Sequence, residues 1–303
     1  MKEIIALIIP AFSLFTYIIL SSIEFGASIF SIVPALLSDK DAVKNYMNPM
    51  WETTTIFLAF SLISLFSFFP GATATWSTGL FIILFTFLAC MGVRVVCILI
   101  SNYARMSSFA LHVLYMVICC VSAILGSYIV LYFIAGTWHL SASISSWTAL
   151  LTLSTIFLTA SSFFRAYEKN GKLTELVRIS GTLFFVSATY FLIDMLRAYP
   201  YLSSYYLSIG VPCILIACIA GGIIAEFKNE YRASFLIVCT ALGSLFSGFF
   251  IAHLPYIIYP TTTIASSVTN NASFTIMEIS LGVGSIFVIP AFILLYKLFI
   301  FDK

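Results

Sequence analysis

Long apolar stretches recur along the whole chain and constrain its fold more than any other feature. An α-helix needs roughly 20 apolar residues to cross the hydrocarbon core of a bilayer. Charged residues make up only 9% of the chain, against about 25% in a typical soluble domain. Nine spans are expected, near residues 4–36, 53–70, 78–101, 109–136, 146–164, 179–198, 204–225, 234–258 and 274–300. The sequence predicts an all-α, polytopic membrane protein and excludes a soluble enzyme or a nucleic-acid-binding protein.

The loops between these stretches are short, and no segment has the composition of a soluble domain. We therefore expect a single transmembrane domain over residues 1–303. The loop lengths are compatible with two helical bundles inside it, at about 1–136 and 146–258, followed by a last helix at 274–300.

The distribution of lysine and arginine predicts how the chain is oriented, because loops on the cytoplasmic side of a membrane are enriched in both residues. If the spans alternate, the side of the N-terminus holds only Lys2 and Arg197. The opposite side holds eleven basic residues: Lys40, Lys44, Arg105, Arg165, Lys169, Lys172, Arg178, Lys228, Arg232, Lys297 and Lys303. The N-terminus is thus expected outside and the C-terminus inside.

Three ionisable residues fall in the inner half of the first three spans, where each is costly and therefore informative. Glu24 lies in the first span, Glu52 opens the second, and Arg94 lies in the third. Short loops make these spans neighbours, so we expect Arg94 to pair with Glu24, with Glu52 or with both. Near the outer face, the spacing of Asp194 and Arg197 allows a local pair on one helix face.

Two roles for this expected cluster remain open at the level of sequence. A buried ion pair can pin the packing of helices. Two carboxylates beside one arginine can also pass a proton, since proximity to arginine favours the charged carboxylate and burial favours the neutral acid. The two roles do not exclude one another.

The histidines and cysteines do not form a recognisable metal site. All seven cysteines lie in apolar spans without zinc-type spacing, and they are interpreted as small buried hydrophobic residues. His112, His139 and His253 are the only histidines, and they are expected at different depths. We therefore expect no haem and no metal to be bound by this chain alone.

Several short motifs resemble subunit II of cytochrome bd-type quinol oxidases. At the N-terminal end they are Ile23-Glu24-Phe25-Gly26, Pro49-Met50-Trp51-Glu52 and Gly92-Val93-Arg94. At the C-terminal end they are Pro255-Tyr256-Ile257-Ile258-Tyr259-Pro260, Asn270-Asn271-Ala272-Ser273, Ile289-Pro290 and Tyr296-Lys297-Leu298-Phe299. The chain departs from the family pattern in having Ser21, Glu24 and Glu52 at three aspartate positions and Thr53-Thr54-Thr55 in place of Gly-Asn-Glu.

This resemblance implies a subunit of a terminal oxidase in the prokaryotic cytoplasmic membrane, which oxidises a quinol and reduces oxygen to water. In that family a haem b and further haems of b or d type are bound by subunit I. Subunit II packs against it, lines a cytoplasmic proton path and in some members holds a structural quinone; a small third subunit is sometimes present. By this resemblance, Glu52 and Glu24 would relay protons, oriented by Arg94, with Trp51 packed at the start of the relay. Ubiquinol and menaquinol both fit.

Two alternatives come from other functional classes. A secondary transporter would also have many spans, but such folds usually have matching broken helices in two repeats and charges at the midplane. Neither feature is evident in this sequence. A non-catalytic scaffold derived from an oxidase subunit would explain the altered motifs, and a haem-bearing partner would argue against it.

Overall fold

The computed structural model describes residues 2–32, 40–103, 109–137, 140–168, 173–204, 206–268, 272, 274–280, 282–283 and 286. In these ranges the chain is almost entirely helical. The long helices are α1 (Lys2–Ile32), α2 (Lys40–Phe68), α4 (Phe81–Tyr103), α5 (Phe109–Ala135), α6 (Ala142–Glu168), α7 (Thr174–Ala198), α8 (Val211–Phe227) and α9 (Tyr231–His253). The short elements are α3 (Pro70–Gly79), the 3₁₀ turn η2 (Pro200–Leu202), the π-helical turn η3 (Tyr206–Gly210), strands β1 (Tyr256–Ile258) and β2 (Thr262–Thr263), and α10 (Ile264–Ser267).

Eight helices in the described part of the chain are long and apolar enough to cross a membrane. Their apolar segments are Ala6–Phe30, Trp51–Phe68, Phe81–Ser101, Phe109–Ala135, Ala142–Tyr167, Thr174–Ala198, Tyr206–Phe227 and Tyr231–His253. The prediction of an all-α polytopic membrane protein is confirmed. Most of the ninth expected span, 274–300, lies outside the described residues.

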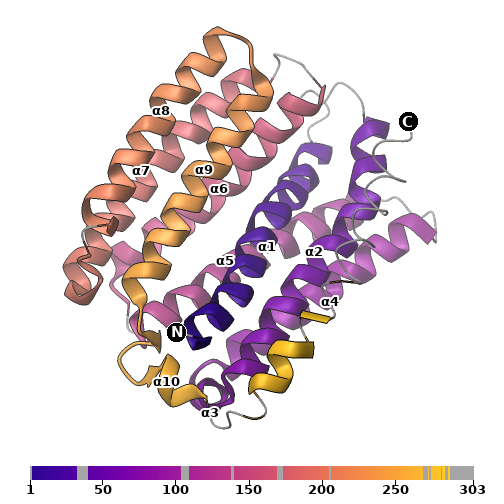
Figure 1. Cartoon of the computed structure of the whole chain (residues 1–303). Helices are drawn as coiled ribbons and strands as arrows, with labels where there is room; N and C mark the ends of the chain where they lie inside the picture. Colours follow the sequence, from indigo (N-terminus) through magenta and orange to yellow (C-terminus); the bar gives the residue numbers. More distant parts are fainter. Residues whose placement is uncertain are drawn as a thin grey trace.

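The long helices pack as two sets that meet along α1 and α6 (Figure 1). The first helix group comprises α1, α2, α4 and α5, and the second helix group comprises α6, α7, α8 and α9. Helix α1 contacts α2 and α5 within its own group and α6 of the second group. The largest cluster of buried apolar side chains lies mainly in the second helix group and includes Phe184, Met195 and Leu245.

A small residue allows α1 and α6 to approach closely. Gly26 of α1 lies against Ala160 of α6, so that a Cβ atom on Gly26 would overlap the Cβ atom of Ala160. Both positions belong to a buried region that also contains Phe30 and Phe164. This crossing joins the two helix groups next to the Glu24 position.

Prolines account for two differences from the predicted spans. Helix α3 begins at Pro70, the last residue of the expected second span, and runs through 71–77, which were expected as a loop. The fixed φ of proline suits the first position of a helix. The eighth span was expected to reach 258, but α9 ends at His253. Pro255 cannot donate the next helical hydrogen bond and disfavours helical geometry at the residue before it. The chain instead forms an antiparallel hairpin in which Tyr256 of β1 pairs with Thr263 of β2.

Candidate functional site

A fully buried ion pair joins the first and third long helices of the first helix group. Nη1 of Arg94 lies 2.9 Å from Oε2 of Glu24, and the two side chains are 1% and 0% exposed. Both residues lie about two turns from the ends of α1 and α4. The predicted pairing of Arg94 with Glu24 is therefore present, and it buries two charges that would each be costly alone.

Two hydroxyl groups complete the polar contacts of this pair. The Tyr115 hydroxyl on α5 donates to Oε1 of Glu24 at 2.8 Å. Nη2 of Arg94 donates to Oγ1 of Thr55 on α2 at 3.2 Å, and Thr55 in turn donates to the backbone carbonyl of Trp51 at 2.8 Å. All four long helices of the first helix group thus contribute to one cluster, which we call the Glu24 cluster: Glu24, Thr55, Arg94 and Tyr115.

The remaining surroundings of the Glu24 cluster are largely apolar. The Arg94 guanidinium carbon lies 5.5 Å from the centroid of the Phe25 ring, a favourable cation–π distance. Nε of Arg94 is buried and has no hydrogen-bond partner among the described residues. Tyr17 is also buried here, but its hydroxyl points to the sulfur of Met91 at 4.0 Å. The cluster therefore lies in a low-dielectric setting in which ionic contacts are strong.

Only part of the expected cluster comes together. Glu52 is exposed on α2, and within the described ranges it makes no ion pair with Arg94, whereas Trp51 contributes its carbonyl through Thr55. Thr55 and Tyr115 were not predicted as site residues. Threonine and tyrosine are common in membrane helices because their insertion costs little free energy, so neither position stands out in the sequence. Thr55 is one turn after Glu52, in the altered motif, and that was the available signal.

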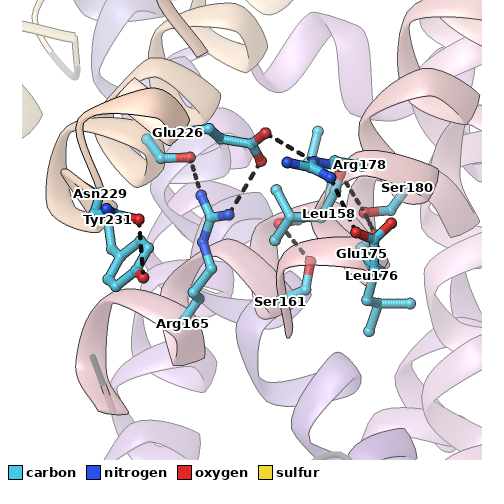
Figure 2. A network of polar contacts seen from close by, with 12 residues as sticks. Leu158, Ser161, Arg165, Glu175, Leu176, Arg178, Ser180, Glu226, Asn229 and Tyr231 are labelled. Atoms are coloured by element: carbon cyan, nitrogen blue, oxygen red, sulfur yellow. Dashed lines mark hydrogen bonds and ion pairs between the residues drawn. The ribbon is translucent and has the colours of Figure 1, made fainter. Parts of the chain in front are cut away.

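A second charged cluster lies at one end of the second helix group (Figure 2). Oε1 of Glu226 accepts from Nη1 of Arg165 at 3.1 Å, and Oε2 accepts from Nε of Arg178 at 3.0 Å. Arg178 also pairs with Glu175 at 3.0 Å, and Arg165 donates to the Ser234 hydroxyl at 2.7 Å. We call these five residues the Glu226 cluster; they come from α6, α7, α8 and α9.

Arg165 is the buried centre of the Glu226 cluster. Its side chain is 0% exposed, against 18% for Glu226 and 56% for Arg178. Its guanidinium carbon lies 5.1 Å from the centroid of the Tyr231 ring. From the sequence, Arg165 was expected in a loop after a span ending at 164. In the structure α6 continues to Glu168 and carries Arg165 inward, because Glu226 and Ser234 satisfy its charge.

Near the opposite end of the molecule, polar contacts differ from those expected. Within the described ranges, Asp194 does not pair with Arg197; it accepts a hydrogen bond from the Ser143 hydroxyl of α6 instead. This contact joins two helices of the second helix group, whereas the expected pair would have been local to α7.

An apolar cavity of about 400 Å³ lies between the two helix groups. Side chains from α1, α2, α4, α5, α6, α7 and α9 line it. It extends from Ser21 and Phe25, next to the Glu24 cluster, to His253 and Tyr256 at the hairpin. Most of its wall is hydrocarbon, so it suits a long apolar molecule.

His253 is unsuited to bind a haem iron in this arrangement. Its Nδ1 lies 3.1 Å from the Tyr201 hydroxyl, and its Nε2 lies 3.1 Å from the carbonyl oxygen of Ile257. Burial raises the pKa of Tyr201, so its hydroxyl stays protonated. His112 takes part in another contact, and His139 lies outside the described residues. In the described ranges, no three His, Cys, Asp or Glu side chains are grouped to hold a metal ion.

Comparisons with known proteins agree with this architecture. A family model described as "Cytochrome bd terminal oxidase subunit II" matches residues 1–299. A protein of Bacillus subtilis (strain 168), provisionally described as a cytochrome bd menaquinol oxidase subunit II, is 24% identical over 331 aligned positions, covering 95% of this chain and 93% of that protein. A chain from the structure of bd oxidase from Geobacillus thermodenitrificans matches with a TM-score of 0.83 and 21% identity, covering 100% of this chain and 99% of that chain.

The family model spans nearly the whole sequence, and the solved structure has the same fold. The transporter alternative is therefore set aside. This chain belongs to the cytochrome bd terminal oxidase subunit II family and is a multi-pass membrane subunit of a quinol oxidase complex.

Proposed function

We propose that this chain is the haem-free second subunit of the oxidase and supports a haem-bearing subunit I while taking up protons for oxygen reduction. The contacts of both ring nitrogens of His253 support the haem-free assignment. In the complex the haems supply the redox chemistry. The contribution of this chain is to hold helices in place and to position groups that exchange protons.

The Glu24 cluster carries the proposal for proton uptake. Glu24 is a completely buried carboxylate between an arginine and a tyrosine hydroxyl. An acid inside a membrane helix costs some 2.5–3.5 kcal/mol on insertion scales, so it needs a structural or functional reason. Arg94 stabilises the carboxylate, and the apolar surroundings stabilise the neutral acid. A group under both influences is suited to bind and release a proton.

Glu52 is proposed as the outer acid of the relay. It is exposed and precedes Thr55 by three residues, so the two side chains share one face of α2. Thr55 contacts Arg94. Thr55 is held in turn by the backbone carbonyl of Trp51 and so positions Arg94. This spacing supports a relay that begins at Glu52 and ends at Glu24.

The proposed relay opens on the cytoplasmic side. The eleven basic residues expected on one side of the membrane support an N-terminus outside and a C-terminus inside. The contacts of α1 with both helix groups support a single transmembrane domain built from two helical bundles. The membrane is then the bacterial cytoplasmic membrane.

The cavity between the helix groups is proposed to hold a structural quinone. Its apolar wall suits an isoprenoid tail, and its ends reach the polar groups of Ser21 and His253. The name of the Bacillus subtilis relative favours menaquinol as the reductant. Extraction of the purified complex with organic solvent should yield about one isoprenoid quinone beyond any on the partner. A variant with Ala123→Trp, which fills the cavity, should yield one fewer.

The assignment is tested by purifying the tagged chain in mild detergent and recording a reduced-minus-oxidised spectrum with quinol-driven oxygen consumption. A second polytopic chain with haem bands and turnover is expected, and a small third subunit would appear in the same preparation. A colourless chain that purifies alone overturns the assignment. A haem-free partner would indicate a scaffold instead.

The proton role is separated from a purely structural role by removing both charges together. In a double variant, Glu24→Gln with Arg94→Gln, no unpaired charge remains buried, and such replacements are often nearly neutral for stability. We expect this variant to assemble with normal haem content and to consume oxygen slowly. Normal turnover per haem would leave the pair with only a structural role.

A further inference from the structure

The two oxygens of the Glu24 carboxylate have different partners. Oε2 accepts from Nη1 of Arg94 at 2.9 Å, and Oε1 accepts from the Tyr115 hydroxyl at 2.8 Å. The arginine guanidinium does not give up its proton in proteins. Oε2 is therefore held in a lasting ionic contact, which leaves Oε1 as the oxygen better placed to release a proton.

Tyr115 is the group in contact with that oxygen. The other buried tyrosine nearby, Tyr17, directs its hydroxyl to Met91 and not to Glu24. On the α2 side, Thr55 contacts Nη2 of Arg94 rather than the carboxylate. A phenolic hydroxyl can donate one hydrogen bond while accepting another, which is what passage of a proton requires.

We propose that Glu24 releases its proton through the hydroxyl of Tyr115. This inference rests on the proposed proton role of Glu24. When Glu24 is protonated at Oε1, it gives that proton to the Tyr115 oxygen as the Tyr115 hydroxyl proton leaves to a water molecule. The Tyr115 hydroxyl then donates to Oε1, as it does in the structure, and its rotation away from Oε1 prepares it to accept the next proton. In this step one proton leaves to water, Glu24 becomes a carboxylate, and Tyr115 stays neutral.

The placement of Tyr115 gives this step a direction. The α2 side of the cluster, with Thr55 and Trp51, is where the proposed relay begins. Tyr115 lies on α5 and contacts the other oxygen of the carboxylate. A proton that leaves through Tyr115 therefore moves away from α2.

The test compares Tyr115→Phe with Tyr128→Phe in the complete oxidase complex. Tyr128 is a matched control on the same helix, and its hydroxyl contacts the carbonyl of Ser145 at 3.4 Å. Turnover per haem should fall roughly tenfold or more in Tyr115→Phe, a modest share of what proton-transfer groups contribute. The KM for quinol and the haem spectrum should stay unchanged, the solvent-deuterium isotope effect should rise, and Tyr128→Phe should behave as the unmodified complex.

Equal turnover in the two variants overturns the inference. If the doubly neutral Glu24 and Arg94 variant is slow while Tyr115→Phe is normal, only the role of Tyr115 is lost; if both are normal, the proton role of Glu24 fails too. Should Tyr115→Phe not assemble, 3,5-difluorotyrosine at the same position keeps the hydroxyl and makes it more acidic. A shift of the turnover–pH profile toward lower pH supports the proposal, and an unchanged profile contradicts it.

Discussion

Arg94 and Arg165 have the same kind of surroundings, one in each helix group. Each guanidinium pairs with a glutamate, donates to a hydroxyl and lies over an aromatic ring, and in the described part of the chain each leaves its Nε buried without a hydrogen-bond partner. The charges are exchanged, however. In the first helix group the glutamate is on α1 and the arginine is on α4. In the second helix group the arginine is on α6 and the glutamate is on α8. Each cluster joins helices of one group only.

Replacing Arg94 alone should prevent stable assembly. In Arg94→Ala the Glu24 carboxylate stays buried without its ionic partner, at a cost of about 3–5 kcal/mol. Haem content per purified chain and the thermal midpoint of the complex should both fall. An Arg94→Ala complex with normal haem content would contradict the role of this pair in packing.

The Glu226 cluster contains two arginines whose removal should have unequal effects. Arg165→Ala removes the buried partner of Glu226 and Ser234 and leaves Glu226 with Arg178 alone, so it should destabilise the second helix group by about 1–3 kcal/mol. Arg178→Ala removes an exposed partner, and surface ion pairs contribute little. Thermal midpoints of the two variants in the same detergent provide the comparison. Equal losses would show that burial does not decide the contribution of these arginines.

Substitutions at two glycines should separate close packing from helix propensity. Gly26→Ala inserts a methyl group against Ala160 and should cost about 1–3 kcal/mol through overpacking between α1 and α6. Gly92→Ala is the matched control, because no atom of the described residues lies within 4 Å of a Cβ built at Gly92. We expect a lower thermal midpoint for the first variant and no loss for the second. A tolerated Gly26→Ala would mean that α1 and α6 can separate freely.

Loss of the exposed acid on α2 should affect turnover without affecting assembly. Glu52→Gln is expected to slow oxygen consumption while leaving the haem spectrum intact, since Glu52 is exposed and, in the described ranges, makes no ion pair with Arg94. Glu230→Gln, at another exposed carboxylate, serves as the control. Unchanged turnover in Glu52→Gln would remove this residue from the proposed relay.

The sequence predicted those features whose energetic cost is large. A charge inside an apolar span is rare, so the sequence alone limited the expected partners of Arg94 to Glu24 and Glu52, and the structure shows the pair with Glu24. Arg165 was missed because it lies at the end of a span, next to basic residues that normally face water. Tyr115 was missed for a different reason: it is one of 16 tyrosines, and its partner is 91 positions away in the chain.

The hairpin after α9 illustrates a further limit of hydropathy. Residues 256–258 are as apolar as the helix before them, yet they form β1. Apolar character predicts burial but does not distinguish a strand from a helix over so few residues. Pro255 and Pro260, which flank this segment, were the local signals for the change.

The cavity between the helix groups makes hydrocarbon a structural component of the subunit. The side chains that line the space of about 400 Å³ lose packing contacts wherever no chain fills it. A bound lipid or quinone chain supplies those contacts. A detergent that strips bound chains would then weaken the subunit without breaking a single contact between its residues, and cells could alter its lifetime through the chain length of their lipids and quinones.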